Sequence, residues 1–185
     1  MPELPPAEPV TCADQWCRFS AFPPNGDIVE IEADGTQVWI RDEHDVIARW
    51  DGGPGDLPER WTWWNLDADV RDLWVGDGVA FAVGREGFAA RFEAGKWTTL
   101  RTGAGIWCVL ASVDGLPGGP VWAAADDALL RFDNTTVTKI ELPSSFSAEG
   151  TAHVEVVAAD EIWLMGDLAV WRRKGGKWRK YPFKP

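Results

Sequence analysis

Short alternating runs of apolar and polar residues recur along the chain, and four of them share one pattern. Each begins with a hydrophobic or aromatic pair, passes through a short polar turn, and ends in a second alternating run. The copies are VWIRDEHDVIARWDG (38–52), AFAVGREGFAARFEAG (80–95), VWAAADDALLRFD (121–133) and IWLMGDLAVWRRKGG (162–176). Their spacing of 41 or 42 residues predicts one supersecondary unit repeated four times.

Each unit is predicted to contain four short strands, because no segment shows a sustained 3.6-residue apolar period. The fourth unit shows the division well, as HVEVVAA, EIWLMG, LAVWRRKG and KWRKYPF. Four-stranded units at this spacing are typical of a β-propeller. We therefore predict an all-β propeller of four four-stranded blades, and a two-layer sandwich, which would not require the repeat, is the alternative. The expected blades span about 27–66, 70–100, 106–142 and 153–183.

The N-terminal part precedes the repeats. Residues 1–14 are rich in Pro and Glu and are predicted to form an extended linker, so that the propeller domain covers 15–185. The segment 15–22, QWCRFSAF, resembles the last strand and is predicted to be an extra N-terminal strand that covers an edge or binds a neighbouring chain. Four blades can close as a monomer, which we expect, or two chains can form an eight-bladed homodimer.

Composition narrows the partners of this 185-residue chain. The net charge of −11 argues against nucleic-acid binding, because phosphates are bound by clustered Lys and Arg. No apolar run is long enough for a membrane span. Cys12 and Cys17 are close enough for a disulfide, which would indicate an oxidising compartment, and the alternative is two independent thiols. Cys108, in the apolar run IWCVL, is predicted to be a buried hydrophobic residue.

The repeat resembles a bacterial propeller repeat of the form D-G-x-x-W-x-x-G-x-x-G-x-x-x-R-x-D-G-x-x-W. That repeat occurs in two-component regulator propellers and in Trp-rich secreted or lipoprotein propellers. The resemblance implies a ligand- or protein-binding module outside the cytoplasm, either periplasmic or secreted, with a lipid anchor as one option. The matching residues are Asp34, Gly35, Trp39, Arg49 and Gly52 in the first unit, Asp77, Gly78, Phe81, Gly84, Gly87, Arg91, Gly95 and Trp97 in the second, Asp114, Gly115, Trp122, Arg131 and Asp133 in the third, and Asp160, Trp163, Gly166, Arg172, Gly175 and Trp178 in the fourth.

Motifs of catalysis are absent from the sequence. It has no Gly-x-Ser-x-Gly, His-Glu-x-x-His, P-loop or Gly-x-Gly-x-x-Gly pattern, and the sialidase-like Ser-x-Asp-x-Gly-x-x-Trp box is also missing. We therefore expect a non-enzymatic binding or assembly module without a cofactor or a metal.

The first strand of each propeller blade lines the central channel, so residues at the starts of these strands should share one rim. Alignment of the units on their turn aspartates places Asp72 and Glu155 in one column, and a second column lies two residues earlier. The predicted ligand-binding residues of this acidic rim are Asp27, Asp72, Trp107, His153 and Glu155.

Four interpretations of the rim remain open. It can be a solvated loop face, a recognition surface for a basic protein segment or polar ligand, or a cation site, although EF-hand spacing is missing. The fourth is a glycan-active enzyme in which Asp72 and Glu155 form a carboxylate pair.

A cluster of tryptophans, Trp61-Thr62-Trp63-Trp64, offers a different function. Strand alternation should direct Trp64 to the face opposite Trp61 and Trp63. An exposed Trp64 would stack on sugar rings, as in a carbohydrate-binding lectin, and the alternative is packing against the N-terminal strand.

Overall fold

The computed structural model describes residues 27–35, 37–51, 61–103, 108–148 and 152–183, and the backbone of 11–13 and 16–18. Most of the predicted linker therefore lies outside the described residues. The chain divides into two compact units, Met1–Leu66 and Asp67–Pro185, which are described separately. No helix in the described ranges has the length and hydrophobicity that a membrane crossing requires.

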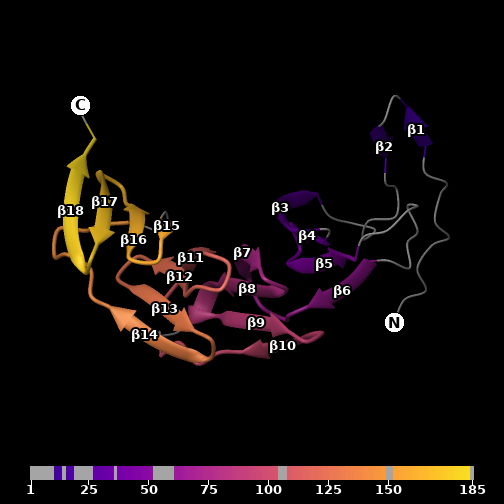
Figure 1. Cartoon of the computed structure of the whole chain (residues 1–185), viewed down its shortest axis with the longest axis horizontal. Helices are drawn as coiled ribbons and strands as arrows, with labels where there is room; N and C mark the ends of the chain where they lie inside the picture. Colours follow the sequence, from indigo (N-terminus) through magenta and orange to yellow (C-terminus); the bar gives the residue numbers. More distant parts are fainter. Residues whose placement is uncertain are drawn as a thin grey trace. The chain divides into compact units, whose positions relative to one another are not determined.

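The first unit contains a hairpin and one four-stranded sheet (Figure 1). The hairpin strands are β1 (Thr11–Ala13) and β2 (Trp16–Arg18), and their register places Cys12 opposite Cys17. The predicted extra strand is thus paired with β1, which begins inside the predicted linker. The disulfide between Cys12 and Cys17 remains a prediction, because only the backbone of these two residues is described. The antiparallel sheet runs in the order β3 (Ile28–Asp34), β4 (Gln37–Asp42), β5 (Val46–Trp50) and β6 (Trp61–Asn65).

The second unit contains three further antiparallel sheets of four consecutive strands. Their first strands contact one another in the order β7, β11, β15, and in Figure 1 the fourth strands lie on the outer side. With the sheet of the first unit, they confirm the all-β prediction of four four-stranded units, here called blades 1 to 4. The strands are β7 (Val70–Gly76), β8 (Val79–Gly84), β9 (Ala89–Glu93) and β10 (Lys96–Thr99) in blade 2, β11 (Leu110–Gly115), β12 (Val121–Ala125), β13 (Leu129–Asp133) and β14 (Thr136–Ile140) in blade 3, and β15 (His153–Ala158), β16 (Glu161–Met165), β17 (Ala169–Lys174) and β18 (Lys177–Pro182) in blade 4.

The core of the second unit lies between its blades. One buried cluster joins blades 2 and 3 around Phe81 and Phe132, and another joins blades 3 and 4 around Trp122 and Trp171. The predicted burial of Cys108 is confirmed only in part, because the residue precedes β11 and is half-buried against the first cluster. The blades are therefore held together by side chains from alternate strand positions.

An arginine on the third strand of every blade stacks over the aromatic residue of the second strand, which explains two positions of the sequence repeat. In blade 2, for example, the guanidinium of Arg91 lies 5.9 Å from the ring centre of Phe81, and it also pairs with Glu93. Cation–π contacts of this kind contribute on the order of 0.5–1 kcal/mol each at exposed sites. The other pairs are Arg49 over Trp39, Arg131 over Trp122 and Arg172 over Trp163.

Strand register corrects the predicted columns of first-strand residues. Asp114 lies inside β11, opposite Trp122, because the turn that follows β11 is lengthened to residues 116–120, whereas the turn after β7 contains only 77–78. Alignment on the turn aspartates is therefore shifted in blade 3. In blade 4, a β-bulge between Val156 and Ala158 and the place of Asp160 as the second residue of its turn shift the alignment by two residues relative to blade 2. Asp72 is therefore level with His153, not with Glu155. The column opposite the repeat aromatics is Glu32, Trp74, Asp114 and Glu155, and the column two residues earlier is Glu30, Asp72, Ser112 and His153.

Candidate functional site

Polar side chains of these two columns join the blades of the second unit. A carboxylate oxygen of Asp72 accepts a hydrogen bond of 2.7 Å from the backbone N–H of Val113 in blade 3. The hydroxyl oxygen of Ser112 accepts one of 2.7 Å from the N–H of Val154 in blade 4. Asp114 accepts another, of 2.5 Å, from Val156. Asp72, which was predicted as a rim ligand, is thus engaged in holding two blades together.

Asp114 is a half-buried carboxylate at the joint between blades 3 and 4. Burial raises its pKa above the usual aspartate range, and the hydrogen bonds from the N–H groups of Val156 and Gly115 oppose that rise. The net direction shows that desolvation outweighs the hydrogen bonds. A neutral acceptor in this position would satisfy the same N–H group without the cost of a buried charge.

The joint between blades 2 and 3 differs because Trp74 occupies the column position of Asp114. The indole N–H of Trp74 donates a hydrogen bond of 3.1 Å to the carbonyl oxygen of Gly115. A β-carbon at Gly76 would lie 2.7 Å from the indole ring, and one at Gly115 would lie 3.1 Å from it. Glycine is therefore needed at Gly76 to accommodate the tryptophan, while Gly115 allows the two strands to approach closely.

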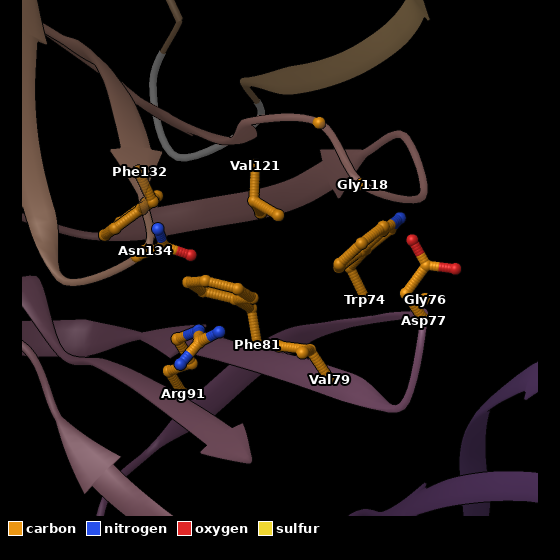
Figure 2. A pocket seen from close by; sticks show the side chains of 11 residues that line it. Trp74, Gly76, Asp77, Val79, Phe81, Arg91, Gly118, Val121, Phe132 and Asn134 are labelled. Carbon is orange, nitrogen blue, oxygen red and sulfur yellow. The ribbon is translucent and has the colours of Figure 1, made fainter.

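A cleft of about 130 Å³ opens beside Trp74, between blades 2 and 3. Figure 2 shows Trp74 and Phe81 of blade 2 facing Val121 and Phe132 of blade 3. Its polar lining comes from side chains in the turns and on β9, namely Asp77, Arg91 and Asn134. The arrangement is an apolar, aromatic interior with a small number of polar groups, as is usual for ligand sites.

The polar groups of the cleft are unequal in charge. Arg91 is neutralised by Glu93, whose pKa is lowered by the hydrogen bond from the guanidinium. Asp77 is exposed, and no ion-pair partner is found for it among the described residues. It sits in a tight turn at φ 53°, which keeps its side chain beside the mouth of the cleft. The uncompensated charge of the cleft is therefore negative.

The predicted acidic rim lies at the opposite ends of the strands, where several acids are engaged locally. One oxygen of Asp42 accepts hydrogen bonds of 2.9 Å from the N–H groups of both His44 and Val46, as a turn-forming aspartate does. Asp69 is paired with Arg71 and Arg85. These acids stabilise the turns that carry them.

A small hollow of about 80 Å³ lies on the same rim, between blades 2 and 3. Cys108, Asp127 and Lys139 contribute to it, and Asp127 is paired with Lys139 at 3.4 Å. Burial raises the pKa of the Cys108 thiol, and the charges of Asp127 and Asp126 add to the increase. The hollow is too small for more than a few atoms.

The remaining predicted site residues are distributed over the two units. Asp27 is exposed before β3, and His153 and Glu155 are exposed on β15. Trp107 lies outside the described residues. Trp64 stacks on the buried ring of Trp39, with a centroid distance of 5.6 Å, so one of its faces is occupied by packing.

Sequence reasoning did not identify the cleft beside Trp74, although a signal was present. In the column opposite the repeat aromatics, three blades carry an acid and only blade 2 carries an aromatic residue, Trp74. Alignment on the aromatic pairs shows this difference only with a one-residue gap, because the column residue lies seven residues before the aromatic in blades 1 and 2 and eight residues before it in blades 3 and 4.

Comparisons with solved structures support the fold. The chain is similar to Ycf48 bound to a D1 peptide, with 16% identity over 90% of this chain and 57% of that chain and a TM-score of 0.63. A chain in the complex of S. cerevisiae Dbp5 with Nup159, Gle1, IP6 and ADP gives 12% identity, 92% and 50% coverage, and a TM-score of 0.62.

A third similar structure is the extracellular domain of the putative hybrid two-component system BT3049 from B. thetaiotaomicron, at 13% identity, 85% and 23% coverage, and a TM-score of 0.58. No family model and no curated protein matches the chain. This chain spans about half the length of the first two structures. At these identities the similarity shows a shared fold, so the chain is similar in fold to β-propeller proteins.

Proposed function

We propose that this chain is a non-enzymatic binding module that holds a segment of a protein partner by inserting one of its side chains into the cleft beside Trp74. The cleft itself is the observation that carries the proposal. An apolar cavity of about 150 Å³ is large enough for benzene. The volume of about 130 Å³ therefore suits one aromatic ring or one branched aliphatic side chain.

Charge favours a basic segment. Asp77 places an uncompensated carboxylate at the mouth, and the whole chain has a net charge of −11. A lysine or arginine next to the inserted side chain would pair with Asp77, and the acidic surface would increase the rate of encounter. The peptide bound in the Ycf48 structure is consistent with this use of the fold.

Non-enzymatic action and a location outside the cytoplasm are parts of the same proposal. The carboxylate pair required for a glycan-active enzyme is compromised because Asp72 accepts the N–H of Val113, and Asp72 and Glu155 lie in different columns. The extracellular domain from B. thetaiotaomicron supports the location by similarity of fold. Cell fractionation tests it, and recovery in the cytoplasm would contradict it.

The binding proposal is tested by panning a phage-displayed library of random peptides on the immobilised chain. We expect enriched peptides to carry an aromatic or branched aliphatic residue beside Lys or Arg. Val79→Phe fills the cleft from its edge and should abolish binding of these peptides. Asp77→Asn removes one exposed ion pair and should weaken binding about two- to fivefold, as measured by fluorescence polarisation.

Asp160→Asn is the matched control, because Asp160 occupies the corresponding turn of blade 4, away from the cleft. It should leave affinity unchanged. Peptides that bind Val79→Phe as tightly as the unmodified chain would exclude the cleft. If Asp127→Asn reduced their binding instead, the acidic rim would be the recognition surface.

A further inference from the structure

Three hydrogen bonds across the joints of the second unit follow one rule, to which the bond from Trp74 to Gly115 is the exception. The first strand of the preceding blade supplies hydrogen-bond acceptors, and the first strand of the following blade supplies backbone N–H groups and apolar side chains. The donors Val113, Val154 and Val156 are 5%, 1% and 6% exposed, so these positions are buried wherever a joint is formed. The joint between blades 3 and 4 is therefore formed by acceptors in both columns of blade 3 and by alternate apolar residues of β15.

Blade 4 carries an acceptor half of such a joint that is open. His153 and Glu155 occupy the register positions of Ser112 and Asp114, but both are exposed. No hydrogen-bond partner is found for either side chain among the described residues. Met165, which pairs with His153 across the sheet, is 42% exposed. A face that is covered on blade 3 is therefore uncovered on blade 4.

Blade 1 carries the complementary donor half. Ile31 and Ala33 lie opposite Ile40 and Val38, as Val154 and Val156 lie opposite their own second-strand partners. Ile31 is 67% exposed, whereas its equivalent Val154 is 1% exposed. By register, Ile31 and Ala33 occupy the positions of Val154 and Val156, whose N–H groups point away from β16 toward Ser112 and Asp114, so we infer that those of Ile31 and Ala33 point away from β4. Their side chains and N–H groups are thus presented as in a joint that lacks its partner.

We propose that β3 of a second copy of this chain docks against β15 of the first. The N–H groups of Ile31 and Ala33 then donate to a ring nitrogen of His153 and to the carboxylate of Glu155, and Ile31 becomes buried. If β3 of the first copy also docks against β15 of the second, the result is a two-fold dimer in which the half-joints of both chains are occupied.

A second copy is the occupant because both complementary halves are present in one chain. The first two similar structures are longer than this chain, which spans 57% and 50% of them, so the fold accommodates a larger ring than these four blades alone. Closure of β3 on β15 of its own chain is the competing arrangement.

Light scattering coupled to size-exclusion chromatography of the full chain tests the dimer. We expect a mass near twice the chain mass of 20.5 kDa. Ile31→Lys places a charge in the joint, and Glu155→Lys replaces an acceptor with a donor. Each should reduce the mass to that of one chain while circular dichroism stays unchanged, since both residues are exposed in the single chain.

Two further samples make the result specific. Leu168→Lys also adds a charge at an exposed apolar residue, 71% exposed, but outside β3 and β15, and it should leave the dimer intact. A mixture of Ile31→Lys and Glu155→Lys chains should recover dimer mass, because such a pair retains one unmodified joint. A single-chain mass for the unmodified protein, a dimer of Ile31→Lys, or no recovery on mixing would overturn the proposal.

Discussion

Replacement of Asp114 separates the two roles of a half-buried carboxylate, hydrogen-bond acceptor and buried charge. Its bond of 2.5 Å from Val156 is charge-assisted, a class that contributes about 1.5–3 kcal/mol. Asp114→Ala removes the acceptor and leaves the N–H of Val156, a residue 6% exposed, without a partner. Relief of the carboxylate's desolvation offsets part of that loss. We therefore expect Asp114→Ala to lower the free energy of unfolding by about 2 kcal/mol.

Asp114→Asn keeps an acceptor oxygen and removes the charge, so its cost at pH 7 should be less than about 1 kcal/mol. Because the pKa of Asp114 is raised in the folded protein, its protonated form favours folding. That contribution is complete below the unfolded-state pKa and is lost as the pH rises through the folded-state pKa. The unmodified chain should therefore gain stability relative to Asp114→Asn on acidification from pH 7.

Urea unfolding of the three proteins, followed by tryptophan fluorescence at neutral and acidic pH, measures both effects. Asp133→Ala is the control, because Asp133 forms an exposed pair with Arg131 that contributes about 1 kcal/mol or less. The reasoning is refuted if Asp114→Asn is as damaging as Asp114→Ala at pH 7. It also fails if the difference between the unmodified chain and Asp114→Asn does not change with pH.

Three other outcomes follow from the described contacts. Trp74→Phe should lower the free energy of unfolding by about 1 kcal/mol or more through loss of the bond to Gly115, and Trp74→Ala by about 3–5 kcal/mol; a Trp74→Phe chain as stable as the unmodified one in urea unfolding would contradict the bond's role. Hydrogen bonds from Arg172 and Lys174 lower the pKa of Glu161 to about 2, so Glu161→Gln should reduce the thermal midpoint of unfolding at pH 7. The difference in midpoint from the unmodified chain should shrink between about pH 5 and pH 2, and a difference that does not change with pH would argue against the ion pairs. Cys108 should react with iodoacetamide more slowly than a free thiol at pH 8, and Asp127→Asn should increase the rate of this reaction. An unchanged rate would show that Asp127 does not contribute to the raised pKa of the thiol.

The four-unit architecture could be read from sequence because a repeat imposes the same alternation at a fixed spacing. The predicted strands of blade 4, for example, match β15 to β18 to within one or two residues at their ends. Glycine and aspartate turns mark the boundaries through local conformation alone, so no knowledge of the neighbouring blade was needed.

Residues between blades could not be assigned in this way. Asp72 and Asp114 are ordinary strand acids in sequence, and their role appears only when Val113 and Val156 of the next blade are placed 2.7 Å and 2.5 Å away. A β-bulge in blade 4 and the place of Asp160 as the second residue of its turn also displaced the alignment, which put Asp72 in one column with Glu155.

The sequence by itself determined the repeat, the strands and the four-stranded sheets, because each depends on side-chain alternation and turn chemistry within a few residues. The tertiary structure alone decided which polar side chains are engaged in joints and where a cleft remains. Trp74 shows the reason: its burial, its bond to Gly115 and the space beside it arise from surfaces separated by about one repeat in the chain. Contacts of that range depend on how two blades pack, which no local pattern specifies.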